Sequence, residues 1–110
     1  MIDETITRIE SQVREAEAIP ATQKAELLKL LATLQREVSE LSKTNHEDAR
    51  SIAKFTEVSA LEAIRSEQNP KLRELSLEGM KSSVEGFEES HPKLVQAVNS
   101  ISQTLSNLGI

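Results

Sequence analysis

The sequence predicts an all-α protein, a bundle of four to five amphipathic helices with coiled-coil-like packing that is completed by self-association. Fifty-two of its 110 residues are Ala, Glu, Lys, Leu or Arg, close to the roughly one-half typical of coiled coils and long helices. Apolar residues also recur at alternating steps of four and three, which places them on one face of a helix. At this length we expect a single helical domain over residues 1–110.

The N-terminal part of the chain predicts two helices, over residues 3–17 and 20–42. Pro20 ends the first and suits the first turn of the second, because the N–H that proline lacks would be unpaired there anyway. Leu28 and Leu30 widen the stripe of the second helix to a face that suits two neighbours. The two stripes are Ile2, Ile6, Ile9, Val13 and Ala16, then Leu27, Leu31, Leu34, Val38 and Leu41.

A third helix is predicted over residues 46–66. Thr44 with Glu47 three residues later matches a capping box, which starts a helix, although a helix continuous through residues 42–46 stays open as the alternative. The large apolar residues recur at steps of three, which drift around a helix and predict several neighbours or oblique packing. They are Ile52, Phe55, Val58, Leu61 and Ile64, beside a small-residue face of Ala49, Ala53, Ala60 and Ala63.

A fourth helix is predicted over residues 70–89, because Asn69 before Pro70 marks a turn and apolar residues follow at helical spacing. Gly79 and Gly86 fall inside this run. Each glycine disfavours a helix interior by roughly 1 kcal/mol relative to alanine, so each marks either close packing or simple tolerance. The apolar residues are Leu72, Leu75, Leu77, Met80, Val84 and Phe87.

A last helix is predicted over residues 91–108, with Ser90 as N-cap and Gly109 at the C-cap position. After Ser90 the only formally charged side chain is Lys93, so the polar face of this helix is neutral. Because charged residues are depleted at interface cores, we expect this helix to lie in an oligomer or against a partner, with a neutral surface helix as the alternative. The interface candidates are Leu94, Val98, Ile101, Leu105 and Leu108.

Charge and composition exclude several classes of function. The net charge is −5 and no segment is a basic arm, which disfavours nucleic-acid binding. The polar faces are rich in Glu, whereas helices at membrane surfaces favour Lys and Arg opposite bulky aromatic residues, so we expect no membrane partner. An acidic start where a signal peptide is basic, with no cysteine, predicts a cytoplasmic protein.

The C-terminal segment resembles a small bacterial family known only as a domain of unknown function. The residues that carry this resemblance are Phe87-Glu88-Glu89-Ser90-His91-Pro92 and the closing Leu108-Gly109-Ile110. Members of this family characteristically end with a phenylalanine, an acidic residue, Ser-His-Pro, an apolar helix and Leu-Gly-Ile. The resemblance covers about the last 40 residues and implies a short helical cytoplasmic protein, with no known activity, cofactor or catalytic residue. Residues 45–69 look like an extra helix compared with shorter relatives.

One constellation points to metal chemistry. Glu88 and His91 have the Glu-x-x-His spacing that ferritin-like bundles use to present a carboxylate and an imidazole. Here Glu88 and His91 lie on either side of a predicted helix break. The sequence contains no second Glu-x-x-His motif, so a dimer would have to supply the second half of the site. We therefore keep a metal site across a dimer as the alternative, and otherwise expect no cofactor.

The remaining motifs favour a protein without enzymatic activity. The chain has thirteen serines but only two histidines that could act as a general base. It also lacks the glycine-rich motif that positions a nucleophilic serine in hydrolases. The three glycines are spread singly, so there is no phosphate-binding loop. We expect a non-enzymatic protein that acts in scaffolding or partner binding through its apolar helix faces, with a homodimer as the assembly.

Overall fold

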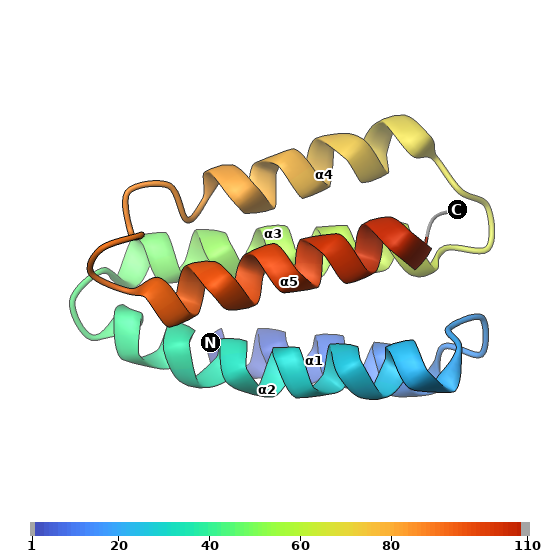
Figure 1. Ribbon diagram of the computed structural model, residues 1–110, viewed down its shortest axis with the longest axis horizontal. Coiled ribbons are helices and arrows are strands. Elements are labelled where there is room, and N and C mark those ends of the chain that lie inside the picture. Colours follow the sequence, from blue (N-terminus) through green and yellow to red (C-terminus); the bar gives the residue numbers. More distant parts are fainter. Residues whose placement is uncertain (1, 109–110) are drawn as a thin grey trace.

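The computed structural model describes residues 2–108, and side chains from residue 4 onward, as five helices (Figure 1). They confirm the predicted all-α class and bundle. Their bounds are α1 (Ile2–Glu15), α2 (Ala21–Ser42), α3 (His46–Ile64), α4 (Pro70–Ser82) and α5 (Pro92–Leu108).

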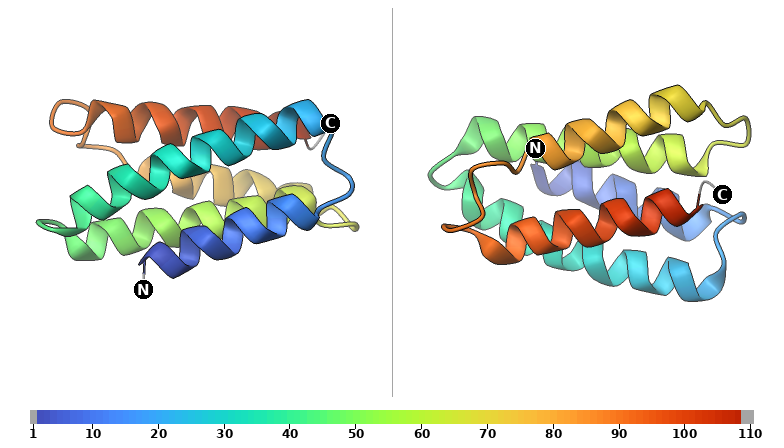
Figure 2. Two further views of the ribbon diagram at one scale, coloured as in Figure 1. Left: turned by 90° about the horizontal axis from the view of Figure 1, so that it is seen from below. Right: turned by 45° about the horizontal axis from the view of Figure 1, so that its top comes forward.

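Helix α3 is the centre of the bundle, because it contacts each of the other four helices. Helices α1 and α2 pack on one side of it, and α5 packs against both α2 and α3. Helix α4 lies at the edge opposite α1 and contacts only α3 and α5 within residues 2–108 (Figures 1 and 2). This arrangement leaves α4 with fewer neighbours than a helix in the middle of the bundle.

The core is built from the stripes of α1, α2 and α5, as their regular spacing predicts. Each side chain in the α2 stripe is at most 1% exposed, and those of α5 up to Leu105 are fully buried. Leu28 and Leu30 are half-buried and pack against the same core, so the wide face of α2 does serve several neighbours. The stripe residues in the core are Ile6, Ile9, Val13, Leu27, Leu31, Leu34, Val38, Leu41, Leu94, Val98, Ile101 and Leu105.

Helix α3 buries its small residues and exposes most of its large ones. All four alanines of the small-residue face are buried, whereas Phe55, Val58 and Leu61 are 37 to 45% exposed. Small side chains let neighbouring backbones approach closely, and this suits a helix that has to contact four others. Thr56 and Ser59 are also buried, and their hydroxyls donate to the carbonyl oxygens of Ile52 and Ser76. The expectation of several neighbours is therefore confirmed.

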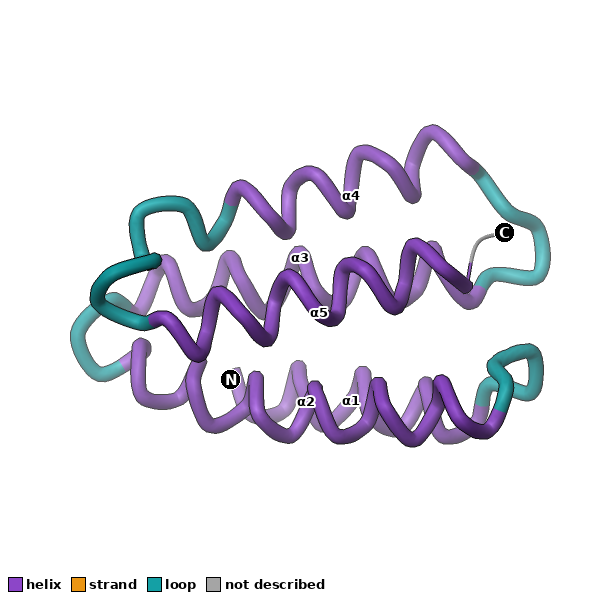
Figure 3. The backbone as a smooth tube through the Cα atoms, in the orientation of Figure 1, coloured by secondary structure: helices purple, strands orange, loops and turns teal. Residues whose placement is uncertain are grey.

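The fourth helix is shorter than the sequence predicts, and the prediction of helix over residues 70–89 is wrong at its C-terminal end. Helix α4 ends at Ser82, and turns connect it to α5 (Figure 3). The Ser83 hydroxyl donates to the Met80 carbonyl at 2.6 Å, and Val84 is buried in the core. Gly86 has a φ of 95°, in the left-handed region that favours glycine, so it belongs to a turn and not to a helix interior.

The predicted break between the second and third helices is confirmed, but its capping box is not. The N-cap of α3 is Asn45 without a side-chain cap bond, and the Thr44 hydroxyl lies 2.8 Å from Asn45 Oδ1. The last helix begins at Pro92, and Ser90 Oγ lies 2.9 Å from His91 Nδ1. The predicted C-cap, Gly109, lies outside the described residues.

An ion pair joins α1 to the central helix. Arg8 Nε donates to Glu57 Oε2 at 2.7 Å, and Lys54 Nζ lies 3.7 Å from Glu57 Oε1. The hydrogen bond from Arg8 is the main cause that holds the pKa of Glu57 below its ordinary value. Because the unfolded chain then binds a proton at a higher pH than the folded one, the pair stabilises the fold at neutral pH. This stabilisation is lost as the pH falls through the folded pKa.

We expect Glu57→Gln to lower the free energy of unfolding at neutral pH and to flatten its decline in acid. The glutamine does not titrate, so the loss that the wild type shows below about pH 4.5 becomes smaller. Urea unfolding at a series of pH values from neutral to acid measures both effects. Parallel pH profiles for the two proteins would contradict the role given to this carboxylate.

Candidate interaction surface

The interface candidates predicted on the last helix lie inside the bundle. Leu94, Val98, Ile101 and Leu105 are fully buried, and Leu108 is half-buried against the core. Helix α5 packs against α2, α3 and α4 of the same chain, so these side chains are already covered. They share one face of α5, as their spacing predicts, and that face forms part of the core of one chain.

The other face of α5 is exposed and polar, and Lys93 near its start is its only charged side chain, as the sequence predicts. Gln103 Nε2 donates to Asn107 Oδ1 at 3.2 Å, one helical turn further on, and Thr104 Oγ1 donates to the Ser100 carbonyl at 3.0 Å. The side chains therefore pair along the helix. This face carries little charge and no exposed large apolar residue. Its exposed polar members are Lys93, Gln96, Asn99, Ser100, Gln103, Ser106 and Asn107.

The large exposed apolar residues gather instead on α3 and α4. Leu72 and Leu75 of α4 are 44% and 50% exposed. The two helices pack against each other, and Figure 2 shows them side by side along one edge of the bundle. Exposed large apolar residues that gather on two adjacent helices mark interaction sites more often than scattered single residues do. We call this set the α3–α4 surface, and it consists of Phe55, Val58, Leu61, Leu72 and Leu75.

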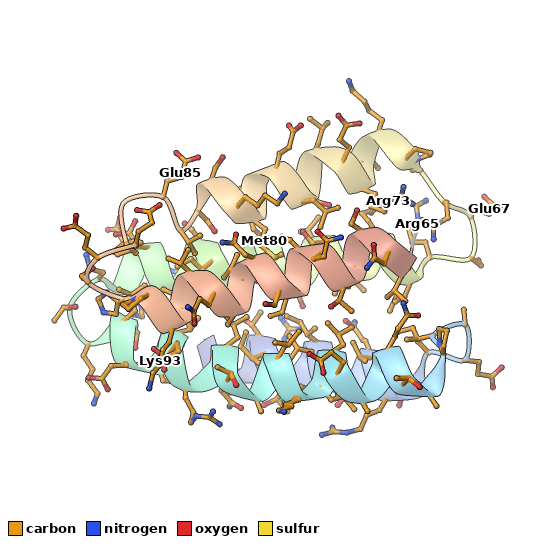
Figure 4. The ribbon with its side chains drawn as sticks, viewed as in Figure 1. Arg65, Glu67, Arg73, Met80, Glu85 and Lys93 are labelled. Atoms are coloured by element: carbon orange, nitrogen blue, oxygen red, sulfur yellow. The ribbon has the colours of Figure 1, made fainter. Side chains whose placement is uncertain are left out.

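Helix α4 exposes Leu72 and Leu75 because it buries only a narrow inward face. Ser76 and Met80 are its buried residues, and Figure 4 shows Met80 on the side of α4 that faces the rest of the bundle. The Ser59 hydroxyl donates to the Ser76 carbonyl at 2.9 Å, so a polar contact ties the two helices together where a pair of leucines could have packed. Leu72 and Leu75 stay outside this contact.

Phe55 lies across the backbone of α4 at Gly79. A Cβ at position 79 would lie 2.6 Å from the Phe55 Cδ1 atom, closer than side chains tolerate. Of the two interpretations of this glycine, close packing is therefore the one that applies. Hollows of about 490 and 520 Å³ adjoin Phe55, the first lined by Lys54 and Val58 and the second reaching Gly79. The Phe55 ring therefore borders both hollows of this surface.

We expect Gly79→Ala to change stability by less than about 1 kcal/mol in the wild type. Alanine gains about 1 kcal/mol over glycine in a helix interior, but here its methyl group displaces the Phe55 ring. In a Phe55→Ala background the ring is gone, so the same change stabilises by about the full 1 kcal/mol. A double-mutant cycle by urea unfolding measures the difference, and equal effects in both backgrounds would contradict the contact.

Glu88 and His91 lie at the corner between α4 and α5, where each has a partner within the chain. Glu88 Oε1 accepts from the Gly86 N–H at 2.9 Å, and the His91 ring packs edge-on against Phe87 with a centroid distance of 5.8 Å. No group of three or more His, Cys, Asp or Glu side chains that could hold a metal occurs among the described residues. These contacts form a structural corner.

A family comparison decides where the chain belongs. A family model described as "Domain of unknown function (DUF4404)" matches residues 27–110. The chain belongs to the DUF4404 family. The match extends well beyond the C-terminal segment that carries the sequence resemblance, and it includes residues 45–69, so α3 lies within the DUF4404 region. No curated protein and no solved structure matches the chain.

The DUF4404 match includes all five residues of the α3–α4 surface. No helix among residues 2–108 is long and apolar enough to span a bilayer. This surface was not predicted from the sequence, because the steps of three that include Phe55, Val58 and Leu61 indicated a helix with several neighbours or oblique packing. A signal was present, since these residues lie opposite a face of four alanines, and a helix with two apolar faces has one available for a partner.

Proposed function

We propose that this DUF4404 protein is a non-enzymatic interaction protein, with a scaffolding or partner-binding role carried by the α3–α4 surface. The observation that carries the proposal is the gathering of five large apolar side chains, each 37 to 50% exposed, on two adjacent helices. Exposing them to water is unfavourable by roughly 25 cal/mol for each Å² of apolar area, and a bound protein would recover that free energy.

The surroundings of this surface support protein binding over other roles. Lys54 and Arg50 line the hollow beside Val58, so a polar rim borders the apolar centre, as in protein interfaces. The absence of cysteine fits a reducing compartment, and a cytoplasmic location is part of the proposal. Self-association is the form of partner binding that the sequence favours, since the chain has only two aromatic residues with which to build its own core.

Cross-linking in cells tests the proposal. A photo-crosslinking amino acid replaces Leu75 in one version of the protein and Gln103, on the exposed face of α5, in the other. We expect discrete protein adducts from position 75 that a further Val58→Glu substitution removes, and few from position 103. Equal yields at the two positions, or adducts that Val58→Glu leaves unchanged, would overturn the proposed function.

A further inference from the structure

We infer that the α3–α4 surface binds a second copy of this chain through a two-fold axis that runs along the groove between α3 and α4. This inference rests on the proposed function and names its partner. In this arrangement α3 of each copy lies on α4 of the other, and four helices enclose the apolar residues. The heights of the residues on the two helices, their charges and the exposed apolar area carry the inference.

Two contacts define which residues of α3 and α4 lie at the same height, that is, at the same position along the helix axes. Ser59 Oγ meets the Ser76 carbonyl at 2.9 Å, and the Phe55 ring lies on Gly79, so the helices run antiparallel with these positions level. Counting along both helices from these contacts, Val58 and Leu75 lie within about one helical turn, 5.4 Å, of the same height. Rotation about an axis parallel to the helices keeps every height unchanged. Val58 of each copy therefore meets Leu75 of the other.

The charges beside the apolar residues are complementary in the same arrangement. Lys54, Val58 and Leu61 follow one another at helical spacings of four and three, and so do Lys71, Leu75 and Glu78 on α4. Lys54 and Glu78 also lie within about one turn of the same height. The rotation therefore places Lys54 of each copy beside Glu78 of the other, and the two-fold symmetry forms this pair twice.

Lys54 is available for such a pair. Its side chain is 61% exposed, and its contact with Glu57 is long, at 3.7 Å. Glu57 keeps its hydrogen bond from Arg8 at 2.7 Å when Lys54 turns away. The hollow of about 490 Å³ that Lys54 and Val58 line gives the Glu78 side chain of the second copy a place to enter.

The exposed area fits an interface between two small proteins. Taking about 150 to 250 Å² for a large side chain, exposed fractions of 37 to 50% on five residues leave roughly 400 Å² of apolar surface. A standard interface buries about 800 Å² on each partner, of which roughly 60% is apolar. The α3–α4 surface and its charged rim therefore supply about what one side of a dimer requires.

Cysteine pairing in the purified protein tests the arrangement without background, because the chain has no cysteine of its own. One variant carries Val58→Cys and a second, distinguished by an affinity tag, carries Leu75→Cys. The two are mixed and oxidised, and gel mobility separates the mixed pair from pairs of like variants. Helix content by circular dichroism verifies that each variant is folded. A mixture of Val58→Cys with Gln103→Cys, whose cysteine lies on α5, is the matched control.

We expect the Val58–Leu75 mixture to yield at least severalfold more mixed disulfide dimer than the Gln103 control. Excess dimers of like variants, Val58 with Val58 or Leu75 with Leu75, would overturn the inference, because they indicate an axis perpendicular to the helices. Yields equal to the control would overturn it as well, since this surface would then not bind a second copy. The proposed function would still stand in that case if position 75 gives adducts to another protein in cells.

Discussion

Truncating Leu34 to alanine lowers the free energy of unfolding by about 2 to 5 kcal/mol, which is the usual loss for a fully buried leucine. Leu34 is 0% exposed and lies at the middle of the α2 stripe, and α2 packs against α1, α3 and α5. The cavity left by the missing atoms is bordered by several helices, so it closes poorly. Urea unfolding followed by circular dichroism measures the loss, provided that the m-value, the slope of the unfolding free energy against urea concentration, is unchanged.

The matched control for this substitution is Leu28→Ala on the same helix. Leu28 is half-buried and packs at the margin of the core, so less apolar surface is lost and the space opens toward solvent. We expect a loss well below that of Leu34→Ala. Equal losses at the two positions would contradict the orientation of α2 in the bundle.

Replacing Ala53 by leucine destabilises the protein by about 1 to 3 kcal/mol, because the added atoms overfill a well-packed interior. Ala53 is 1% exposed and belongs to the small-residue face of α3. That face lets α3 lie close to its neighbours, and a leucine there forces at least one of them outward. Thermal and urea unfolding both report the loss.

Ala25→Leu on α2 is the control, since Ala25 is exposed and the same atoms are added there to solvent. We expect this control to change stability by no more than about 0.5 kcal/mol. A neutral Ala53→Leu would show that α3 has room for large side chains on its inward face. The explanation for why Phe55 and Val58 point outward would then fail.

Regular apolar spacing made most of the fold predictable. The stripes of α1, α2 and α5 alternate steps of four and three, and the structure buries their described residues on one side. The break near residues 42–46 was predictable from its polar composition, although the helix starts after Asn45 and not at a Thr44 cap. Local patterns decide such features, because a helix and its buried face depend on residues close in sequence.

The features that the sequence did not predict depend on residues far apart in the chain. Steps of three in α3 did not reveal which face turns inward, because both the alanines and the larger residues could have packed there. The choice follows from how many helices α3 contacts, and that is a property of the whole bundle. The early end of α4 likewise depends on Val84, which turns into the core, and on the positive φ of Gly86.

The mass of the protein in solution tests most directly whether the α3–α4 surface is an interface between two copies. Sedimentation equilibrium compares the wild type with Leu75→Glu, which charges the surface, and Gln103→Glu, which adds the same charge to the exposed face of α5. We predict a dimer for the wild type and for Gln103→Glu, and a monomer for Leu75→Glu with its helix content intact. A wild type that stays monomeric, or a Leu75→Glu protein that stays dimeric, would contradict the account.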